Sequence, residues 1–385
     1  MRGGATMIKA YKIRLYPTKE QESLMWQHIG ACRYVWNWML AKQQELYKQG
    51  EKHLFAFSMI RLLTPLKKDG EHEWLYEVSN TSCQITCQDL DKAYKEFFAK
   101  RRGFPRFKSR KKSKPSFPVC NEKLRIVSDT VMQIQKLGRV KCRIDNRLNT
   151  DATYKFFNAR ITYKNGKWIM TVGIENESQV PELTDKSMGI DLGVKDSAIV
   201  AFGSEQIVLP NINKGRQVRL LKKRIKHLQR SASRKYEANK TGKKYNKTKN
   251  IVKCEEKLRK LHERLSNIRT NYIHQSTSKL IKLLPCRIVM EDLNVRGMMK
   301  NKHLSKAVQE QCLSEWIRQM QYKCVWSGIE FVQADRFYPS SKTCSNCGCI
   351  KHDLKLSDRT FVCNECGFTI DRDYQAALNL MRYEG

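Results

Sequence analysis

The first regular pattern along the chain is an alternation of apolar and basic residues over positions 8–16. A period of two is typical of a half-exposed β-strand. Thr18 follows, with Gln21 three residues later, and this capping-box pair predicts the start of a helix. Apolar residues then recur at helical spacing to about residue 99. The first hundred residues are therefore predicted to form one strand and a set of helices.

The middle of the chain changes to short alternating segments, which predict a small β domain. Two of these segments are joined by Asn165-Gly166, a dipeptide that favours a tight hairpin turn. The predicted strands are residues 131–134, 140–144, 156–163 and 168–174. A polar linker over residues 175–185 leads into the second half.

The second half alternates strand-like and helix-like patterns, so it is predicted to have mixed α and β character. Residues 187–202 indicate a strand, a tight turn and a second strand. The longest pattern, residues 214–280, predicts a helical hairpin. Three shorter segments follow, namely a strand at 287–290, a helix at 304–326 and a strand at 329–333.

The charge of the chain narrows the choice of partner. Its 385 residues include 73 Lys and Arg against 38 Asp and Glu, a formal net charge of +35. Because like charges repel in a compact chain, this excess indicates a polyanionic partner. An apolar run of about 18 residues is absent, which argues against a membrane-spanning helix. The N-terminus lacks the apolar core of a signal peptide, so a cytoplasmic location is expected.

Two basic segments are candidates for contact with that partner. Residues 100–117 interleave basic side chains with three phenylalanines, which suits phosphate neutralisation together with stacking on unpaired bases. The alternative for this segment is a disordered, solvated linker. The exposed face of residues 214–264 is also mostly basic, and an ordinary solvated face is its alternative. The candidate residues are Arg101, Arg102, Arg106, Lys108, Arg110, Lys222, Lys223 and Arg224.

Three acidic residues occupy positions where a carboxylate is costly. Asp191 and Glu291 each end an apolar strand-like segment, and Asp373 begins an amphipathic helix. A carboxylate among apolar residues is unfavourable unless it is paired or binds a metal. Three converging carboxylates can hold two Mg²⁺ ions about 3.5–4 Å apart, an arrangement suited to in-line phosphodiester hydrolysis. Two neighbours compete: Asp371, which suits a helix N-cap, and Asp292, which is expected to point to the opposite side of its strand end.

Four cysteines have the spacing of a zinc site. They form two Cys-x-x-Cys pairs that are separated by 15 residues, and a glycine after each pair permits a tight turn. The ligands are Cys344, Cys347, Cys363 and Cys366. Four thiolates leave no open position on the metal, so one structural Zn²⁺ is predicted. The site precedes Asp373 directly and is expected to stiffen the segment that carries it. A redox dithiol is the alternative.

Taken together and in this order, these residues resemble the TnpB family, transposon-encoded RNA-guided endonucleases related to type V CRISPR effectors. The resemblance covers nearly the whole chain. Its marks are Tyr11-Lys-Ile-Arg-Leu-Tyr-Pro-Thr18, Cys32-Arg-Tyr-Val-Trp-Asn-Trp38, Gly103-Phe-Pro-Arg-Phe-Lys108, Gly189-Ile-Asp-Leu-Gly193, Met290-Glu-Asp-Leu293, Ser340-Ser-Lys-Thr-Cys-Ser-Asn-Cys-Gly348 and Asp371-Arg-Asp-Tyr-Gln-Ala-Ala-Leu-Asn379.

The resemblance implies an α+β multidomain fold. It combines an RNase H-like nuclease domain of the RuvC type, carrying the Cys₄ zinc ribbon, with an N-terminal β-barrel wedge domain that has an inserted helical recognition domain. The expected divisions are the first wedge strand at 1–17, the helical domain at 18–116, the remaining wedge at 117–180, the nuclease at 185–340 and 368–385, and the ribbon at 341–367.

The resemblance also implies Mg²⁺-dependent cleavage of double-stranded DNA beside a short transposon-adjacent motif. The guide is an RNA from the transposon end, and the protein is expected to act as a monomer with that RNA. Carried over by position, Asp191, Glu291 and Asp373 are the catalytic, metal-binding acids, which favours Asp373 over Asp371. Two other functions remain open: an RNA-guided DNA-binding regulator that does not cut, which the intact triad argues against, and an RNase H-like transposase.

Motif reading is expected of the N-terminal helices. Gln84 and Gln88 lie one helical turn apart there, and their amides are able to reach base edges. The alternative for this pair is an exposed amide face.

Overall fold

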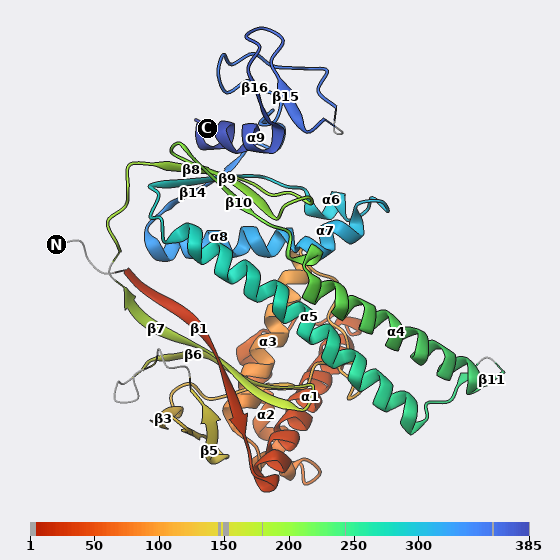
Figure 1. Ribbon diagram of the computed structural model, residues 1–385. Helices are drawn as coiled ribbons and strands as arrows, with labels where there is room; N and C mark the ends of the chain where they lie inside the picture. The colour runs from red at the N-terminus through yellow and green to blue at the C-terminus, as the bar shows by residue number, and fades with distance from the viewer. Residues whose placement is uncertain are drawn as a thin grey trace. The chain divides into compact units, whose positions relative to one another are not determined.

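The computed structural model describes residues 5–144, 148, 154–178, 180–242, 244–355 and 358–384. The chain divides into an N-terminal unit, residues 5–177, and a C-terminal unit that begins at Ser178. Both units combine helices and sheet, so the fold is of the α+β type (Figure 1). None of the helices in the described residues is both long and apolar enough to cross a bilayer.

The N-terminal unit contains a seven-stranded sheet in the order β2-β6-β7-β1-β5-β4-β3. Its hairpin β6–β7 pairs Lys164 with Lys167 across the Asn165-Gly166 turn, as the dipeptide predicted. The alternating apolar residues of the strands form one core with the first turns of α1. The strands are β1 (Ala5–Tyr16), β2 (Ser116–Pro118), β3 (Arg125–Ser128), β4 (Val131–Ile134), β5 (Gly138–Arg143), β6 (Phe156–Lys164) and β7 (Lys167–Ser178).

The helices of this unit are α1 (Lys19–Lys48), α2 (Ala56–Lys68), the short 3₁₀ helix η1 (Glu73–Tyr76) and α3 (Asn80–Phe98). The predicted capping box is confirmed, because the Thr18 hydroxyl accepts from the Gln21 amide and the Gln21 side chain accepts from the Thr18 amide. A second core joins the later turns of α1 to α2 and α3.

The C-terminal unit is built on a five-stranded sheet in the order β10-β9-β8-β13-β14. Strands β8, β13 and β14 run parallel, whereas β9 and β10 are antiparallel to their neighbours. The strands are β8 (Ser187–Asp191), β9 (Ala198–Phe202), β10 (Glu205–Leu209), β13 (Arg287–Glu291) and β14 (Glu330–Ala334). Strand β10 was not predicted from the sequence.

Helices cover both faces of this sheet (Figure 1). One face packs Met188, Ile190 and Ile288 against α5 (Lys249–Ile281) and α8 (Leu313–Ser327). The other face carries Ile199 and Val289 and is covered by α9 (Arg372–Met381). Because side chains alternate along a strand, every second residue of β8 and β13 faces α9.

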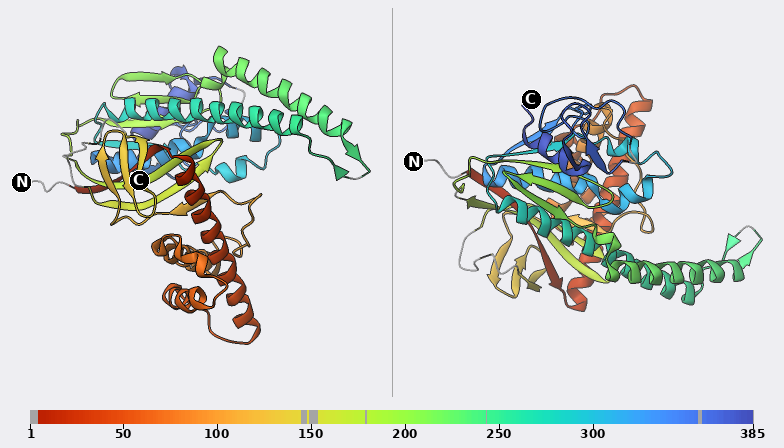
Figure 2. Two further views of the ribbon diagram at one scale, coloured as in Figure 1. Left: turned by 90° about the horizontal axis from the view of Figure 1, so that it is seen from below. Right: turned by 45° about the horizontal axis from the view of Figure 1, so that its top comes forward.

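The predicted helical hairpin is confirmed as α4 (Arg216–Ala238) and α5, which follow the 3₁₀ turn η2 (Ile212–Lys214). The two helices run side by side, and their joined ends extend well beyond the sheet (Figure 2). Their connection contains two short strands, β11 (Lys240–Thr241) and β12 (Lys244–Tyr245). Within the hairpin, Val218, Leu221 and Leu265 form its apolar seam.

The single helix predicted over residues 304–326 was wrong. The structure has α7 (Ser305–Gln311) and α8, separated by Cys312, whose φ of 55° is left-handed. A left-handed residue interrupts the i to i−4 hydrogen bonds, and cysteine gives no sequence signal for it. The remaining elements are α6 (Val295–Met298) and the strands β15 (Thr360–Val362) and β16 (Thr369–Asp371).

Candidate metal centres

The parallel pairing of two strands places two of the three predicted acids at one sheet edge. Strands β8 and β13 are hydrogen-bonded neighbours, with Ile190 opposite Met290. Asp191 and Glu291 are the next residues on each strand, so they end neighbouring parallel strands on the same side. Loops at this edge are where parallel sheets usually place functional groups.

The close approach of α9 brings in the third acid. A Cβ atom at Gly189 would lie 2.0 Å from the Ala377 carbonyl oxygen and 2.3 Å from the Met381 amide nitrogen, so the α9 backbone rests directly on β8. Asp191 lies two residues after Gly189 and therefore faces the same helix. Asp373 lies one helical turn before Ala377, and its charge acts on Asp191.

Neighbouring negative charges also act on Asp191. Burial, followed by the negative charges of Glu291 and Asp373, raises the pKa of the Asp191 carboxyl well above its ordinary value. Arg372 acts in the opposite direction but does not cancel the rise. A carboxyl group that burial and like charges push toward its neutral form is one that a bound cation would restore to the ionised form.

The competing acids are engaged elsewhere. The Asp371 carboxylate caps α9 and accepts from the backbone amides of Asp373 at 3.0 Å and Tyr374 at 3.1 Å. Asp292 forms a 2.5 Å ion pair with Arg336. Asp373 is itself 3.3 Å from Arg372, and its charge acts on Asp191 more strongly than that of Asp371, so the choice of Asp373 stays a prediction.

A serine that sequence reasoning missed holds Glu291. The buried Ser340 hydroxyl donates to Glu291 Oε1 at 2.5 Å. The backbone carbonyl of Ser340 accepts at 2.6 Å from the side-chain amide of Asn379 on α9. The available signal was the Ser-Ser-Lys-Thr run directly before the first cysteine pair, which carries hydroxyls into the strand-end region.

The four predicted zinc ligands come together. Their sulfur atoms all lie within 4.8 Å of one another, with 3.7 Å between Cys344 and Cys366 and 3.5 Å between Cys347 and Cys363. The glycines after the two pairs have φ values of +78° and +69°, so each turn uses a conformation that other residues rarely adopt. A backbone hydrogen bond from Phe368 lowers the pKa of the Cys366 thiol, whereas for Cys347 the effect of a backbone hydrogen bond is outweighed by hydrogen bonds with the other thiols of the cluster, which raise its pKa. One thiol of the cluster thus ionises more readily than another.

The knuckle that carries these cysteines is tied to α9. The Asn379 amide also donates to the Thr343 carbonyl at 2.6 Å, and Gln375 donates to the same carbonyl. Ser345 donates to Gln375 at 2.8 Å. The residues that flank the first cysteine pair thus contact the helix of Asp373, and Ser340 continues the connection to Glu291.

The donor sets fit different metals. Carboxylate oxygens are hard ligands that suit Mg²⁺, and a cation would help the half-buried Asp191 to ionise near Glu291 and Asp373. Four clustered thiols without an oxygen ligand suit a tetrahedral structural Zn²⁺.

The basic segment over residues 100–117 is ordered along the part that touches α1. Trp36 donates from its indole nitrogen to the Arg106 carbonyl at 3.0 Å. Asn37 brackets Lys108 by accepting from its amide at 2.7 Å and donating to its carbonyl at 2.9 Å. The disordered-linker alternative therefore fails. The side chains of Arg101, Arg102, Arg106 and Arg110 are exposed, and Arg101 lies 3.5 Å from Glu96.

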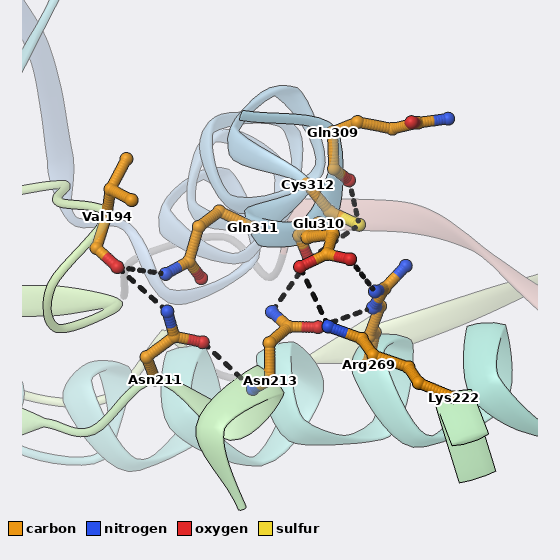
Figure 3. Close-up of polar contacts among 9 residues, drawn as sticks. All are labelled: Val194, Asn211, Asn213, Lys222, Arg269, Gln309, Glu310, Gln311 and Cys312. Carbon is orange, nitrogen blue, oxygen red and sulfur yellow. Dashed lines mark hydrogen bonds and ion pairs between the residues drawn. The ribbon is translucent and has the colours of Figure 1, made fainter. Parts of the chain in front are cut away.

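Two neighbouring lysines on the helical hairpin, Lys222 and Lys223, have different surroundings. Lys222 contacts Glu310 at 2.8 Å, and Arg269 of α5 contacts the same carboxylate at 3.7 Å (Figure 3). Asn213 completes the network by accepting from Arg269 and donating to the Glu310 carbonyl. Lys222 therefore braces the hairpin against α7, whereas Lys223 and Arg224 are exposed.

The predicted motif readers lie on α3. Gln88 is exposed and Gln84 is half-buried, while Ser82 and Thr86 face the interior. The two glutamines thus share the outer face of the helix, one turn apart.

Comparison with known proteins adds three family matches. Residues 7–52 match a model described as a helix-turn-helix domain, residues 170–302 one described as a probable transposase, and residues 314–380 one described as a Cas12f1-like TNB domain. In this structure, residues 7–52 form strand β1 and the single long helix α1.

Similar whole proteins include the putative RNA-guided DNA endonuclease InsQ of Escherichia coli K12, 30% identical over 97% of this chain and 92% of InsQ. A putative RNA-guided DNA endonuclease of Streptomyces pristinaespiralis is 29% identical over 97% of this chain and 88% of its own length. A TnpB-like protein of Acanthamoeba polyphaga mimivirus, L770, is 23% identical over 97% of this chain and 73% of its own.

A solved structure shares the fold. The protein of a cryo-EM structure of a Cas12f1–sgRNA–target DNA complex superimposes with a TM-score of 0.61 and 14% identity, covering 98% of this chain and 99% of that one. With a relative 30% identical along almost the entire chain and a matching fold, the chain belongs to the TnpB family.

Proposed function

We propose that this protein is an RNA-guided DNA endonuclease that hydrolyses phosphodiester bonds at Asp191, Glu291 and Asp373. The observation that carries the proposal is geometric: Asp191 and Glu291 end neighbouring parallel strands, and α9, which bears Asp373, packs directly on β8. The raised pKa of Asp191, caused by burial and by the charges of Glu291 and Asp373, agrees with it. Such a cluster is destabilising by itself, and it is the expected signature of a site built around divalent cations.

The finer fold assignment follows from the sheet. Three antiparallel strands followed by two parallel ones, in the order β10-β9-β8-β13-β14, support a RuvC-type, RNase H-like nuclease domain. Helix α9 against β8 delivers the third acid, and the Cys₄ knuckle supports a zinc ribbon beside it. We assign the N-terminal sheet and its helices to the wedge and recognition roles.

The chain's own residues have distinct parts in the reaction. Asp191, Glu291 and Asp373 would hold two Mg²⁺ ions, which would supply an activated water and positive charge to stabilise the leaving 3′ oxygen. Ser340 orients the Glu291 carboxylate through its hydroxyl. Asp371 fixes the first turn of α9 and so the direction of Asp373. Arg359, 4.0 Å from Asp373, and Arg372 balance the negative charge of the cluster.

Base pairing between the guide RNA and the DNA target determines which DNA sequence is cut. A guide RNA from the transposon end pairs with one strand of a double-stranded DNA target, and the protein reads only a short adjacent motif and the shape of the duplex. Gln84 and Gln88 are the proposed motif readers. The net charge of +35, with exposed Lys223 and Arg224 on the hairpin, suits the RNA and heteroduplex backbone.

The decisive experiment is expression beside the flanking transposon sequence, followed by sequencing of the RNA that copurifies and by cleavage of a DNA library in Mg²⁺. We expect one discrete RNA and cuts beside one short motif. Asp191→Ala should retain the RNA and abolish cutting, whereas Asp292→Asn, which removes a neighbouring acid paired with Arg336, should still cut. A protein that binds RNA and DNA without cutting would be a guided regulator, and strand joining would indicate a transposase.

A further inference from the structure

A cavity of about 580 Å³ lies in the N-terminal unit between α1 and the loop of residues 108–116. Trp26 and Arg33 line it from α1, and Lys108, Arg110 and Lys114 line it from the loop, together with serine hydroxyls. Within the part of the chain that the structure describes, its lining includes no acidic side chain. Its volume is in the range of sites for small organic ligands, about 300–1,000 Å³.

The loop that bounds the cavity is held in place without any ligand. Asn37 fixes Lys108 by its two backbone hydrogen bonds, and Tyr163 of β6 donates to the Pro115 carbonyl at 3.0 Å. Between these anchors, the Ser113 amide donates to the Ser109 carbonyl at 2.9 Å, which closes a turn. A cavity with such a rim does not depend on folding around its ligand, so binding requires little ordering of the loop.

The Lys108 ammonium is partly shielded from water, and no carboxylate of the described residues pairs with it. Its ammonium lies 3.5 Å from the centroid of the Trp36 ring. Burial lowers the pKa of Lys108 to about 8, and the charge of Asp89 opposes this fall. Asp89 is already paired with Arg160 at 2.6 Å. Among the described residues Lys108 forms no ion pair, so an incoming anion would gain a strong partner there.

The lining matches the parts of one nucleotide. Cationic groups and hydroxyls suit a phosphate, and the Trp26 ring, 39% exposed, offers an apolar surface to a base. Inorganic phosphate would use only part of this volume, and inside a duplex each base face is covered by the stacked base pairs on either side, so Trp26 cannot stack on it. The chemistry therefore selects a nucleotide whose base is unpaired.

We propose that this cavity binds one unpaired nucleotide of a nucleic-acid strand, with its phosphate at Lys108, Arg33 and Arg110 and its base against Trp26. The inference rests on the proposed function, because the strand would be the guide RNA or the displaced or target DNA. Such a site would fix the strand at one nucleotide and so set the register of the adjacent base pairing.

The test uses the full chain and a short single-stranded oligonucleotide with one 2-aminopurine, in RNA and DNA forms and as the matching duplexes. Fluorescence quenching reports stacking, and titration gives the dissociation constant. Arg33→Gln and Lys108→Ala should each weaken single-strand binding roughly tenfold, the cost of one charge-assisted hydrogen bond, and should reduce quenching. Arg33→Lys should recover part of the loss. The matched control is Lys111→Ala, which removes one charge from the same loop outside the cavity.

The outcomes separate this inference from the proposed function. The inference would be overturned if the cavity variants bound single strands with the same affinity as Lys111→Ala. It would also be overturned if they lost as much affinity for the duplex as for the single strand. Neither result would contradict RNA-guided cutting. A greater loss of affinity for the RNA probe would assign the site to the guide RNA, and a greater loss for the DNA probe would assign it to a DNA strand. Either result supports the site. A wild-type protein that binds no RNA and cuts no DNA would instead overturn the proposed function. Melting curves check that Arg33→Gln, which changes a half-buried side chain of α1, retains the fold.

Discussion

The Ser340 hydroxyl donates a 2.5 Å hydrogen bond to Glu291 Oε1, and the Ser340 carbonyl is itself held by Asn379 of α9. Glu291 ends strand β13, whereas Ser340 immediately precedes the zinc knuckle. One carboxylate of the proposed active site is therefore positioned by a residue whose own place depends on α9 and the knuckle. Partners of this kind fix the orientation of metal-binding carboxylates.

Replacing Ser340 should lower the affinity for Mg²⁺ more than it slows the cleavage step. Ser340→Ala should raise the Mg²⁺ concentration for half-maximal cleavage roughly tenfold to a hundredfold, the usual cost of removing a partner of a metal ligand. The rate at saturating Mg²⁺ should change much less, and Ser340→Thr should recover much of the affinity. Calorimetric titration with Mn²⁺ gives the same comparison without cleavage. An equal loss of rate at all Mg²⁺ concentrations would contradict a positioning role.

The contact between Gly189 and α9 predicts a strong steric effect. Gly189→Ala would place a Cβ 2.0 Å from the Ala377 carbonyl oxygen of α9, and overpacking against backbone should destabilise the protein by about 3 kcal/mol, the upper end of the usual range. Gly30→Ala in α1 is the control, because no atom lies within 4 Å of its new Cβ. It should stabilise by about 0.5–1 kcal/mol, as helical Gly to Ala changes do. Chemical denaturation of both variants measures the difference.

The pKa of Asp191 predicts how the metal-free protein responds to pH. The folded-state pKa is raised, so below the unfolded value, about 3.9, both states are protonated and no penalty exists. As pH rises from there toward the folded pKa, the unfolded state ionises while burial disfavours the folded carboxylate, so stability falls, by about 1.4 kcal/mol for every tenfold difference between the two ionisation constants. Asp191→Asn should therefore raise the melting temperature in EDTA at neutral pH and abolish the increase that Mg²⁺ gives the wild type. A lower melting temperature of Asp191→Asn than of the wild type in EDTA would contradict the raised pKa of Asp191.

Removing a zinc ligand should lower the metal content and the stability of the protein together. Cys344→Ser should lower the zinc content and the melting temperature in parallel, because four thiolates fix the knuckle. Cys349→Ser is the control, since this exposed cysteine lies beside the cluster but outside it. Zinc stoichiometry by metal analysis and thermal melting give the two readouts. A full zinc content in Cys344→Ser would refute the ribbon.

Lys222 and Lys223 should separate stability from RNA binding. Lys222→Ala leaves Glu310 with Arg269 alone and should lower the melting temperature. Lys223→Ala should leave it unchanged but reduce the salt dependence of RNA binding, by roughly 0.7–0.9 in the slope of log K against log salt for each phosphate that the protein no longer neutralises. The network in Figure 3 would be contradicted if Lys223→Ala lowered the melting temperature and Lys222→Ala did not.

The sequence by itself determined most local structure and the chemistry of the ligands. The capping box at Thr18, the Asn165-Gly166 hairpin and the helical hairpin all follow from short-range patterns, because caps, turns and amphipathic stripes depend on neighbours along the chain. The cysteine spacing named the four residues that cluster in the structure. The order of three acids identified the candidates, and the resemblance chose among them.

Tertiary structure decided what depends on distant segments. The left-handed break at Cys312, the ion pair that occupies Lys222 and the hydrogen bond from Ser340 to Glu291 are all invisible to local sequence pattern. The convergence of Asp191 and Asp373 belongs to the same class. It exists because parallel strand pairing aligns two strand ends and because Gly189 lets a helix backbone lie directly on β8. The sequence supplied the carboxylates, and only packing of the helix on the sheet brought their charges together.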